Sequence, residues 1–427
     1  MASLEQSPRM ASPERARLDA SMFGDTTLAQ VQVTLLLSLM TISIFGAASN
    51  VAQIVLVLMI ASQAWRSLLT AMPRIWILLT FPAMAVASTM WSDAPMISLR
   101  YSLQFAYTVA AGLLVAVAIG PRRMVAALYI SSAVVVFGSL FVNRWGMSEE
   151  GPVLIGLTGS KNQIASVCQM AIAAAFAVMF DKEQPAWMRR SSFIGVFLAL
   201  SMLLQAHSAT GVLTAMGATA AFVGLLLLRP LGTGARLGVI LAALVVLTPV
   251  VVAKDVVVRE AQEVATKVFK KDATLTGRTY LWRKADELIA QKPTLGHGYR
   301  AVWLGKSMTT IGLLRWTGLS DGRGFHFHHT FREVTVDTGY IGLGVFLVSL
   351  GLIGFSLLTN VVWNLTVPTA FFFSAYLTMI SRVFTEVIVG PFSPMTLLLF
   401  ALGVYGVARR NEPARLQPGL VEDRGRR

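Results

Sequence analysis

The sequence has little charge and almost no cysteine. Asp, Glu, Lys and Arg make up only 14% of the 427 residues, and 55% are hydrophobic, whereas soluble domains carry roughly 25% charged residues. This balance excludes an ordinary water-soluble domain. Because Cys168 is the only cysteine, an intrachain disulfide and a cysteine-built metal site are also excluded.

Three further patterns are missing. The chain has no Asp-x-Asp, so a metal-diphosphate site of that type is not available. It has no Gly-rich loop of the kind that cradles a nucleotide's phosphates. The long apolar runs have no acidic residue near their centres, which counts against an ion-coupled transporter, since such proteins often carry intramembrane carboxylates.

What the sequence does contain is a series of apolar runs close to the ~20 residues that cross a bilayer as a helix. The pattern predicts an all-α, polytopic membrane protein with about twelve transmembrane helices. The predicted spans are 28–46, 49–65, 75–91, 101–119, 124–142, 163–180, 191–207, 211–228, 236–253, 334–357, 364–381 and 387–408.

The distribution of Lys and Arg predicts the orientation, because these residues accumulate in short cytoplasmic loops. With both termini cytoplasmic, 18 of the 36 Lys and Arg lie in cytoplasmic segments and only four in short outer segments. The predicted organisation is a cytoplasmic tail (1–26), nine helices (27–253), one large outer loop (254–333), three helices (334–408) and a second cytoplasmic tail (409–427).

The long outer loop is strongly cationic. Between Lys254 and Arg332 it holds 14 cationic and seven acidic side chains, a net charge of +7, which favours an anionic ligand. Within it, apolar residues at helical spacing predict a helix over 277–291, lying on the membrane surface because one face is apolar and the other charged.

All five histidines fall on the outer side in this topology, and three cluster at His326, His328 and His329. A histidine with a pKa near 6.5 can accept the proton of an attacking hydroxyl group. Adjacent histidines without a nearby pair of carboxylates are a weak zinc pattern. The cluster therefore predicts a general base, with ordinary interfacial histidines as the alternative.

Arginines predicted on the outer side are candidates for binding phosphate: Arg100, Arg278, Arg300 and Arg382. A guanidinium group holds a phosphate through two parallel hydrogen bonds and stays charged at any working pH. It can therefore stabilise a departing diphosphate without a metal. Taken singly, each of these arginines is more often a contact to a lipid headgroup.

Short motifs follow one another in order over residues 90–408. They are Trp91-Ser-Asp-Ala-Pro95 with Arg100, Gly156-Leu-Thr-Gly-Ser-Lys161-Asn162, Ser208-Ala-Thr210, Thr276-Gly-Arg278-Thr-Tyr-Leu-Trp282, Pro293-Thr-Leu-Gly296-His-Gly298-Tyr299, His328-His-Thr-Phe-Arg-Glu333 with Gly339 and Gly342, and Thr385-Glu386. Each alone is loose. In this order, around one long outer loop, they resemble the O-antigen ligase and O-antigen polymerase superfamily, nearest to the exopolysaccharide-production polymerases.

The resemblance implies a fold like that of GT-C-type membrane glycosyltransferases, and a metal-independent enzyme without a cofactor. By position, Arg278 looks like the loop arginine that engages the diphosphate, and His328 like the histidine that activates the acceptor. Arg100 and Lys161 resemble further cations facing the diphosphate. Other candidates are Arg300 and Arg382 for the diphosphate, and His326, His329, Glu333 and Glu386 as secondary site residues. The chain departs from the family's pattern at Ala209, where a basic residue is common, and at His329, where Asn is common.

The function implied is a polymerase that joins undecaprenyl-diphosphate-linked oligosaccharide repeats at the periplasmic face of the bacterial inner membrane. Its partners would be the lipid-linked glycan and membrane lipid, with chain-length regulators and flippases as candidate protein partners and no nucleic acid. One alternative is an O-antigen ligase that transfers the glycan to lipid A core. A second, from a different class, is a membrane transporter.

Overall fold

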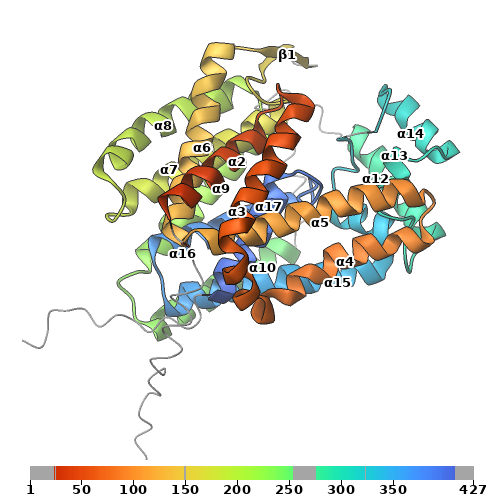
Figure 1. Cartoon of the computed structure of the whole chain (residues 1–427). Helices are drawn as coiled ribbons and strands as arrows, with labels where there is room; N and C mark the ends of the chain where they lie inside the picture. Colours follow the sequence, from red (N-terminus) through yellow and green to blue (C-terminus); the bar gives the residue numbers. More distant parts are fainter. Residues whose placement is uncertain (1–23, 25, 149–150, 253–275, 323, 409–427) are drawn as a thin grey trace, which may run out of the picture.

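The computed structural model describes residues 24, 26–148, 151–252, 276–322 and 324–408, and most of this structure is helical (Figure 1). The helices before residue 253 are α2 (Thr27–Thr41), α3 (Gly46–Ile75), η1 (Trp76–Leu79), α4 (Thr80–Ala87), η2 (Ser88–Trp91), α5 (Pro95–Ala118), α6 (Pro121–Val142), α7 (Lys161–Phe180), α8 (Ala186–Gln205), α9 (Ala209–Leu227) and α10 (Thr233–Val252). The predicted tails, apart from a few residues near 26, and the first part of the predicted outer loop lie outside the described residues.

Seven helical stretches are long and apolar enough to cross a membrane, and three shorter apolar helices accompany them in the described part of the chain. Gly46–Trp91 counts as one stretch of 46 residues, because α3 continues through the 3-10 turn η1 into α4. The structure therefore confirms a polytopic helical membrane protein. The number of twelve spans stays a prediction, although each predicted run overlaps a helix.

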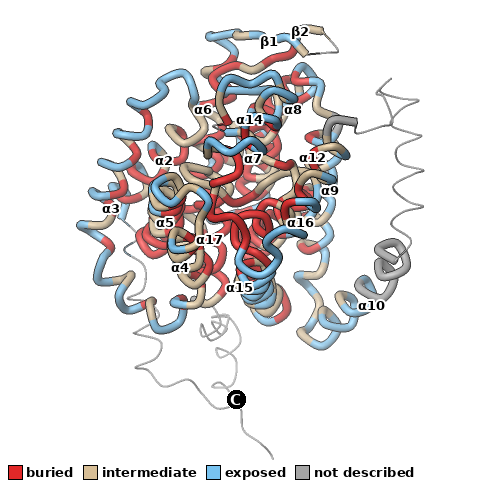
Figure 2. Tube along the Cα trace, turned by 90° about the vertical axis from the view of Figure 1, so that its right-hand side faces the viewer, coloured by how far each residue is buried: buried red, intermediate tan, exposed pale blue. Residues whose placement is uncertain are grey.

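The helices at the periphery of the bundle expose apolar surface, as expected for helices that face lipid. On α8, Phe193, Ile194 and Phe197 are 63%, 64% and 70% exposed. Figure 2 shows that buried residues lie toward the middle of the bundle, whereas exposed residues mark peripheral helices such as α3. In water this surface would be unfavourable, but in a bilayer it contacts hydrocarbon of equal polarity.

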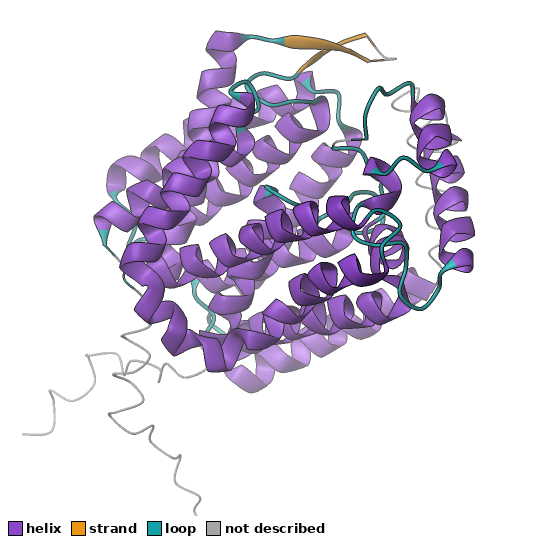
Figure 3. Ribbon diagram, turned by 45° about the vertical axis from the view of Figure 1, so that its right-hand side comes forward, coloured by secondary structure: helices purple, strands orange, loops and turns teal. Residues whose placement is uncertain are grey.

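One short β-hairpin interrupts the helices. The strands β1 (Trp145–Ser148) and β2 (Gly151–Leu154) pair antiparallel, with Trp145 opposite Leu154. Figure 3 shows the hairpin at one end of the bundle, beyond the end of α6. The fold is mostly helical, as predicted, and this short hairpin is an addition that the sequence between two apolar runs did not signal.

The described part of the predicted outer loop forms three helices, α12 (Thr276–Gln291), α13 (Ala301–Leu304) and α14 (Met308–Thr317). The helix expected over 277–291 is confirmed as α12. Its apolar face packs into a small core of its own, which consists of Leu281, Ala285, Leu288, Val302, Trp303, Leu313, Phe327 and Val336. The chain then continues as α15 (Thr330–Trp363), α16 (Val367–Arg382) and α17 (Pro394–Ala408).

A kink in α15 fastens the segment that contains α12, α13 and α14 to the longer helices. Gly339 has φ 66° and ψ −173°, a conformation essentially restricted to glycine. A Cβ atom there would lie 2.2 Å from the carbonyl oxygen of Thr294. The interrupted helix leaves the carbonyls of Val336 and Asp337 free to accept hydrogen bonds from the backbone N–H groups of His297 (2.8 Å) and Gly298 (2.9 Å). Gly298 and Gly339, which both belong to the sequence motifs, thus allow this segment to pack closely against α15.

Candidate active site

The histidine loop, residues 325–329, is held by a buried ion pair behind it. Arg300 Nη1 donates to Glu333 Oε1 at 3.0 Å, and the two side chains are only 12% and 5% exposed. Arg300 Nη2 also donates to the carbonyl of Phe325 at 2.9 Å, and Glu333 Oε2 accepts from the N–H of Phe327 at 2.8 Å. Both partners thereby fix the backbone of the loop.

The chain after α16 brings a carboxylate to this loop. The N–H of Thr330 donates to the carbonyl of Val383 at 2.8 Å, and the Thr330 hydroxyl donates to the carbonyl of Glu386 at 2.7 Å. The same hydroxyl accepts from the N–H of Ile388 at 3.1 Å. Thr330, the first residue of α15, therefore ties the segment of Glu386 directly beside the histidines.

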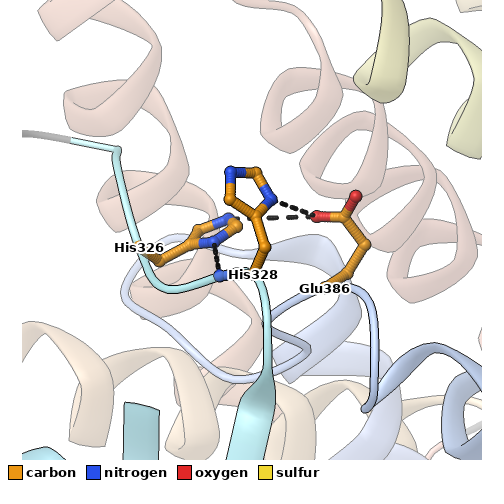
Figure 4. Close-up of side chains that lie close together, drawn as sticks. All are labelled: His326, His328 and Glu386. Carbon is orange, nitrogen blue, oxygen red and sulfur yellow. Dashed lines mark hydrogen bonds and ion pairs between the residues drawn. The ribbon is translucent and has the colours of Figure 1, made fainter. Parts of the chain in front are cut away.

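Glu386 lies at the centre of the resulting cluster. Its Oε2 is 3.6 Å from His328 Nδ1 and 4.0 Å from His326 Nε2, as Figure 4 shows for the three side chains. Its Oε1 is 3.6 Å from Arg278 Nη2, on α12. The structure thus brings together Arg278 and His328, the two residues with predicted catalytic roles, through one shared carboxylate.

Hydrogen bonds distinguish the three histidines. His326 Nδ1 accepts from the N–H of His328 at 3.1 Å, and His329 Nδ1 accepts from the N–H of Arg332 at 3.4 Å. A neutral imidazole whose Nδ1 accepts must carry its proton on Nε2. For His328 the network indicates the opposite tautomer, because its Nδ1 faces the carboxylate of Glu386. Its Nε2 is then left with a lone pair and can act as a base.

Burial keeps the other two histidines neutral. Desolvation, together with the charge that His328 would carry, lowers the pKa of His326 to about 3, although Glu386 opposes the shift. Desolvation and the nearby Arg332 lower the pKa of His329 to about 4. Desolvation alone would raise the pKa of Glu386, but its contacts with His328, His326 and Arg278 outweigh this and lower it. Glu386 is therefore ionised.

The atoms of His326, His328 and Glu386 that could bind a metal lie within 4.8 Å of one another. A metal ion needs a lone pair from each ligand, but the hydrogen bond at Nδ1 of His326 places the proton on its Nε2. That N–H points toward Glu386, and Arg278 lies on the other oxygen of the same carboxylate. The arrangement fits a cluster of facing imidazole and carboxylate groups better than a metal site.

A small polar pocket opens beside the cluster, lined by Asn162, Ala165, Ser166, Gln169, Ser208, Thr210, Gly211, Thr214, Arg278, Arg382 and Glu386. Arg382 is 9% exposed, and its Nη1 donates to Ser166 at 3.0 Å and Gln169 at 3.4 Å. Its Nε has no hydrogen-bond partner among the described residues. The N-terminus of α9, capped by Ser208, adds its unpaired N–H groups and positive dipole end. The pocket therefore suits an anion.

The other predicted cations do not line this pocket. Arg300 is taken up by Glu333 and backbone carbonyls, so its donors are not available to a diphosphate. Arg100 is exposed on α5, with its guanidinium over the ring of Tyr101. Lys161 begins α7 next to Asn162, which does line the pocket. Glu333, a secondary candidate, supports the loop from behind.

Sequence reasoning missed the small polar residues of the pocket. Asn162, Ser166 and Gln169 lie four and three residues apart on α7, which places them on one face of an otherwise apolar helix. That polar stripe was the available signal. Ala209 stands where the family commonly has a basic residue, yet its neighbours Ser208 and Thr210 both line the pocket.

The fold and the site define a polytopic helical membrane protein with an arginine-lined pocket beside a histidine–carboxylate cluster. Residues 194–347 match the protein family described as O-Antigen ligase, in agreement with the resemblance that the motifs indicated. It is also similar to the exopolysaccharide production protein ExoQ of Rhizobium meliloti (strain 1021), with 32% identity over 272 residues. The match covers 63% of this chain and 62% of that relative, less than two thirds of the relative's length.

Proposed function

We propose that this protein is a membrane glycosyltransferase that polymerises undecaprenyl-diphosphate-linked oligosaccharide repeats into surface polysaccharide. The observation that carries the proposal is the shared carboxylate of Glu386, which joins Arg278 and His328 at the edge of the anion pocket. The family match and the similarity to an exopolysaccharide production protein support the same class of reaction.

The diphosphate of the donor lies in the pocket, held by Arg278 and Arg382 and by the N-terminus of α9. These groups present two cations and free N–H donors in a partly dry site, where they stabilise developing negative charge. Ser166 and Gln169 keep the Arg382 guanidinium oriented. Arg100, Lys161 and Arg300 are not part of the pocket and are left out of the proposed set.

His328 acts as the general base. Its Nε2 takes the proton of a hydroxyl group on the acceptor glycan, whose oxygen attacks the anomeric carbon of the donor. A new C–O bond forms, the bond between the anomeric carbon and the diphosphate oxygen breaks, and the electron pair leaves on the diphosphate. The step needs no metal, because the arginines balance the charge of the leaving group.

The topology predicted from charge supports this assignment. The segments that carry Asn162, Ser208, Arg278, His328 and Glu386 all lie on the predicted outer side, although they come from distant parts of the chain. We therefore propose twelve spans with both termini cytoplasmic, in the bacterial inner membrane, with a GT-C-type arrangement and a periplasmic active site. Chain-length regulators and flippases are the proposed protein partners.

The test uses a deletion strain complemented with full-length variants. Arg278→Ala and His328→Ala should insert into the membrane at normal levels but make no long polysaccharide, as seen by gel electrophoresis of surface glycan. Arg283→Ala is the matched control, since this arginine lies on the same helix and contacts the ring of Tyr280 instead of the pocket. Full-length polymer from either Arg278→Ala or His328→Ala would overturn the assignment.

The second candidate function is ligation to lipid A core, which the description of the matched family favours. The same deletion strain separates the two. Loss of long exopolysaccharide with intact lipopolysaccharide supports a polymerase, and the reverse supports a ligase. Unchanged glycans with lost uptake of a solute would favour a transporter.

A further inference from the structure

Glu386 has a backbone held by hydrogen bonds and a carboxylate that makes no close contact with either of its charged neighbours. Its N–H donates to the carbonyl of Arg382 at 2.8 Å, and its carbonyl accepts from the Thr330 hydroxyl at 2.7 Å. Its carboxylate, 17% exposed, lies 3.6 Å from both Arg278 and His328. A strong charge-assisted hydrogen bond between such groups would be about 2.7–2.9 Å long. The carboxylate is thus shared between two partners and closely bonded to neither.

The two partners belong to different halves of the proposed reaction. Arg278 lines the pocket for the donor's diphosphate, and His328 takes the proton from the acceptor. When a diphosphate binds Arg278, the guanidinium donates its hydrogen bonds to the phosphate oxygens. The negative charge of the diphosphate then repels the negatively charged carboxylate of Glu386. On its other side that carboxylate meets Nδ1 of His328 and the Nε2–H of His326.

A carboxylate that accepts from Nδ1–H of a histidine fixes the tautomer in which Nε2 is the base, and stabilises the imidazolium that forms when Nε2 takes a proton. Nδ1 of His328 is buried and has no hydrogen bond in the described structure. Closing a gap of 3.6 Å would therefore satisfy an orphaned donor and strengthen the base together.

We propose that Glu386 is a positioning residue that couples the two substrates: the donor's diphosphate displaces its carboxylate from Arg278 onto Nδ1 of His328, which activates the base only when the donor is bound. The inference rests on the proposed function. In this scheme His328 is a weak base until a lipid-linked donor is bound, so it does not deprotonate acceptor hydroxyls or water before then. The carboxylate itself stays ionised throughout and accepts no proton.

The first test measures binding of inorganic diphosphate to the purified full-length protein by titration calorimetry. Glu386→Gln removes the charge that competes for Arg278, so it should bind diphosphate about two- to fivefold more tightly, the range of a partly exposed ion pair. Arg278→Ala should weaken binding. Glu287→Gln is the matched control, because this exposed residue pairs with Lys284 away from the pocket. Unchanged or weaker diphosphate binding by Glu386→Gln would overturn the coupling.

The second test measures polymer formation in membranes at saturating lipid-linked donor. Glu386→Gln should lower the maximal rate by roughly 100- to 1000-fold, within the range that general-base catalysis contributes. It should also shift the pH profile of the rate, because it removes a negative charge beside the base. The titratable and charged groups that face His328 include Glu386, His326 and Glu333, and those that face Glu386 also include Arg278 and Arg382. Glu386→Asp keeps the charge and should restore part of the rate, which a merely space-filling role would not predict.

The two proposals fail separately. If Arg278→Ala and His328→Ala abolish polymer but Glu386→Gln keeps the full rate and an unchanged pH profile, the coupling is wrong and the proposed function stands. If either Arg278→Ala or His328→Ala keeps the full rate, the proposed function itself is wrong.

Discussion

Two Arg–Glu pairs lie on either side of the histidine loop, and they differ in nearly every physical respect. Arg300 and Glu333 are almost fully buried, 3.0 Å apart, and saturated with hydrogen bonds to the backbone of the loop. Arg278 and Glu386 are 3.6 Å apart, more exposed, and open to a pocket. The first pair holds the loop in place, whereas the second is free to exchange partners.

The difference shows why charge alone did not identify the site. A buried pair that satisfies all its donors has nothing left for a ligand, however basic the segment that carries it. A loose pair at a pocket edge retains donors that a diphosphate can use. The contrast between the two pairs generates the four predictions that follow.

The largest expected effect on stability is that of Arg300→Ala. This change leaves Glu333 buried without its partner, and breaking a buried ion pair in this way costs about 3–5 kcal/mol of the free energy of unfolding. Thermal unfolding of the detergent-solubilised protein measures it, with Arg278→Ala as the control expected to cost at most about 1 kcal/mol. Replacing both buried partners, with Arg300→Met and Glu333→Leu, should recover much of the loss. Equal stability of the two single variants would break the distinction between the pairs.

A smaller effect is expected from Gly339→Ala, which disturbs the kink that places Glu333 and the loop. The backbone conformation costs about 1–3 kcal/mol in any residue other than glycine, and the new Cβ also meets the Thr294 carbonyl. Gly344→Ala is the control on the same helix, because a Cβ there meets nothing within 4 Å. Limited proteolysis and thermal unfolding should separate them, and similar behaviour of both would contradict the role of the kink.

The histidines predict a modest pH dependence of stability. His326 and His329 have folded-state pKa values of about 3 and about 4, below the usual 6.5. The unfolded chain therefore binds more protons between about pH 4 and 6.5, so their contribution to stability is complete above pH 6.5 and is lost as the pH falls through this window. His329→Gln should flatten the curve, and an unaltered slope in that variant would refute the shift.

The smallest expected effect is that of removing divalent ions. Because His326 carries its proton on the nitrogen that faces Glu386, the cluster should work without a metal. Polymer formation in membranes should be unchanged after treatment with EDTA. Loss of activity that one added divalent ion restores would show instead that His326, His328 and Glu386 form a metal site.

Several features of the site were predictable from local sequence. The helix over 277–291 follows from its apolar spacing. The roles proposed for Arg278 and His328 come from the family resemblance, which the match to the O-antigen ligase family supports. Arg300 was predicted in the same way as Arg278, since both lie in the predicted outer loop. The sequence could not tell them apart, because Glu333 and Glu386 lie 33 and 108 residues away from their partners.

The sequence by itself determined a membrane protein with one long cationic segment between its apolar runs, because hydrophobic run length and segment charge are local properties and need no tertiary contact. It also determined which residue types were available for chemistry. The tertiary structure decided which of them meet: Thr330 ties the Glu386 segment to the histidine loop, and α7, α9, α12 and α16 close the pocket. A shared carboxylate and a pocket depend on distances between segments far apart in the chain, and only the packing of the helices sets those distances.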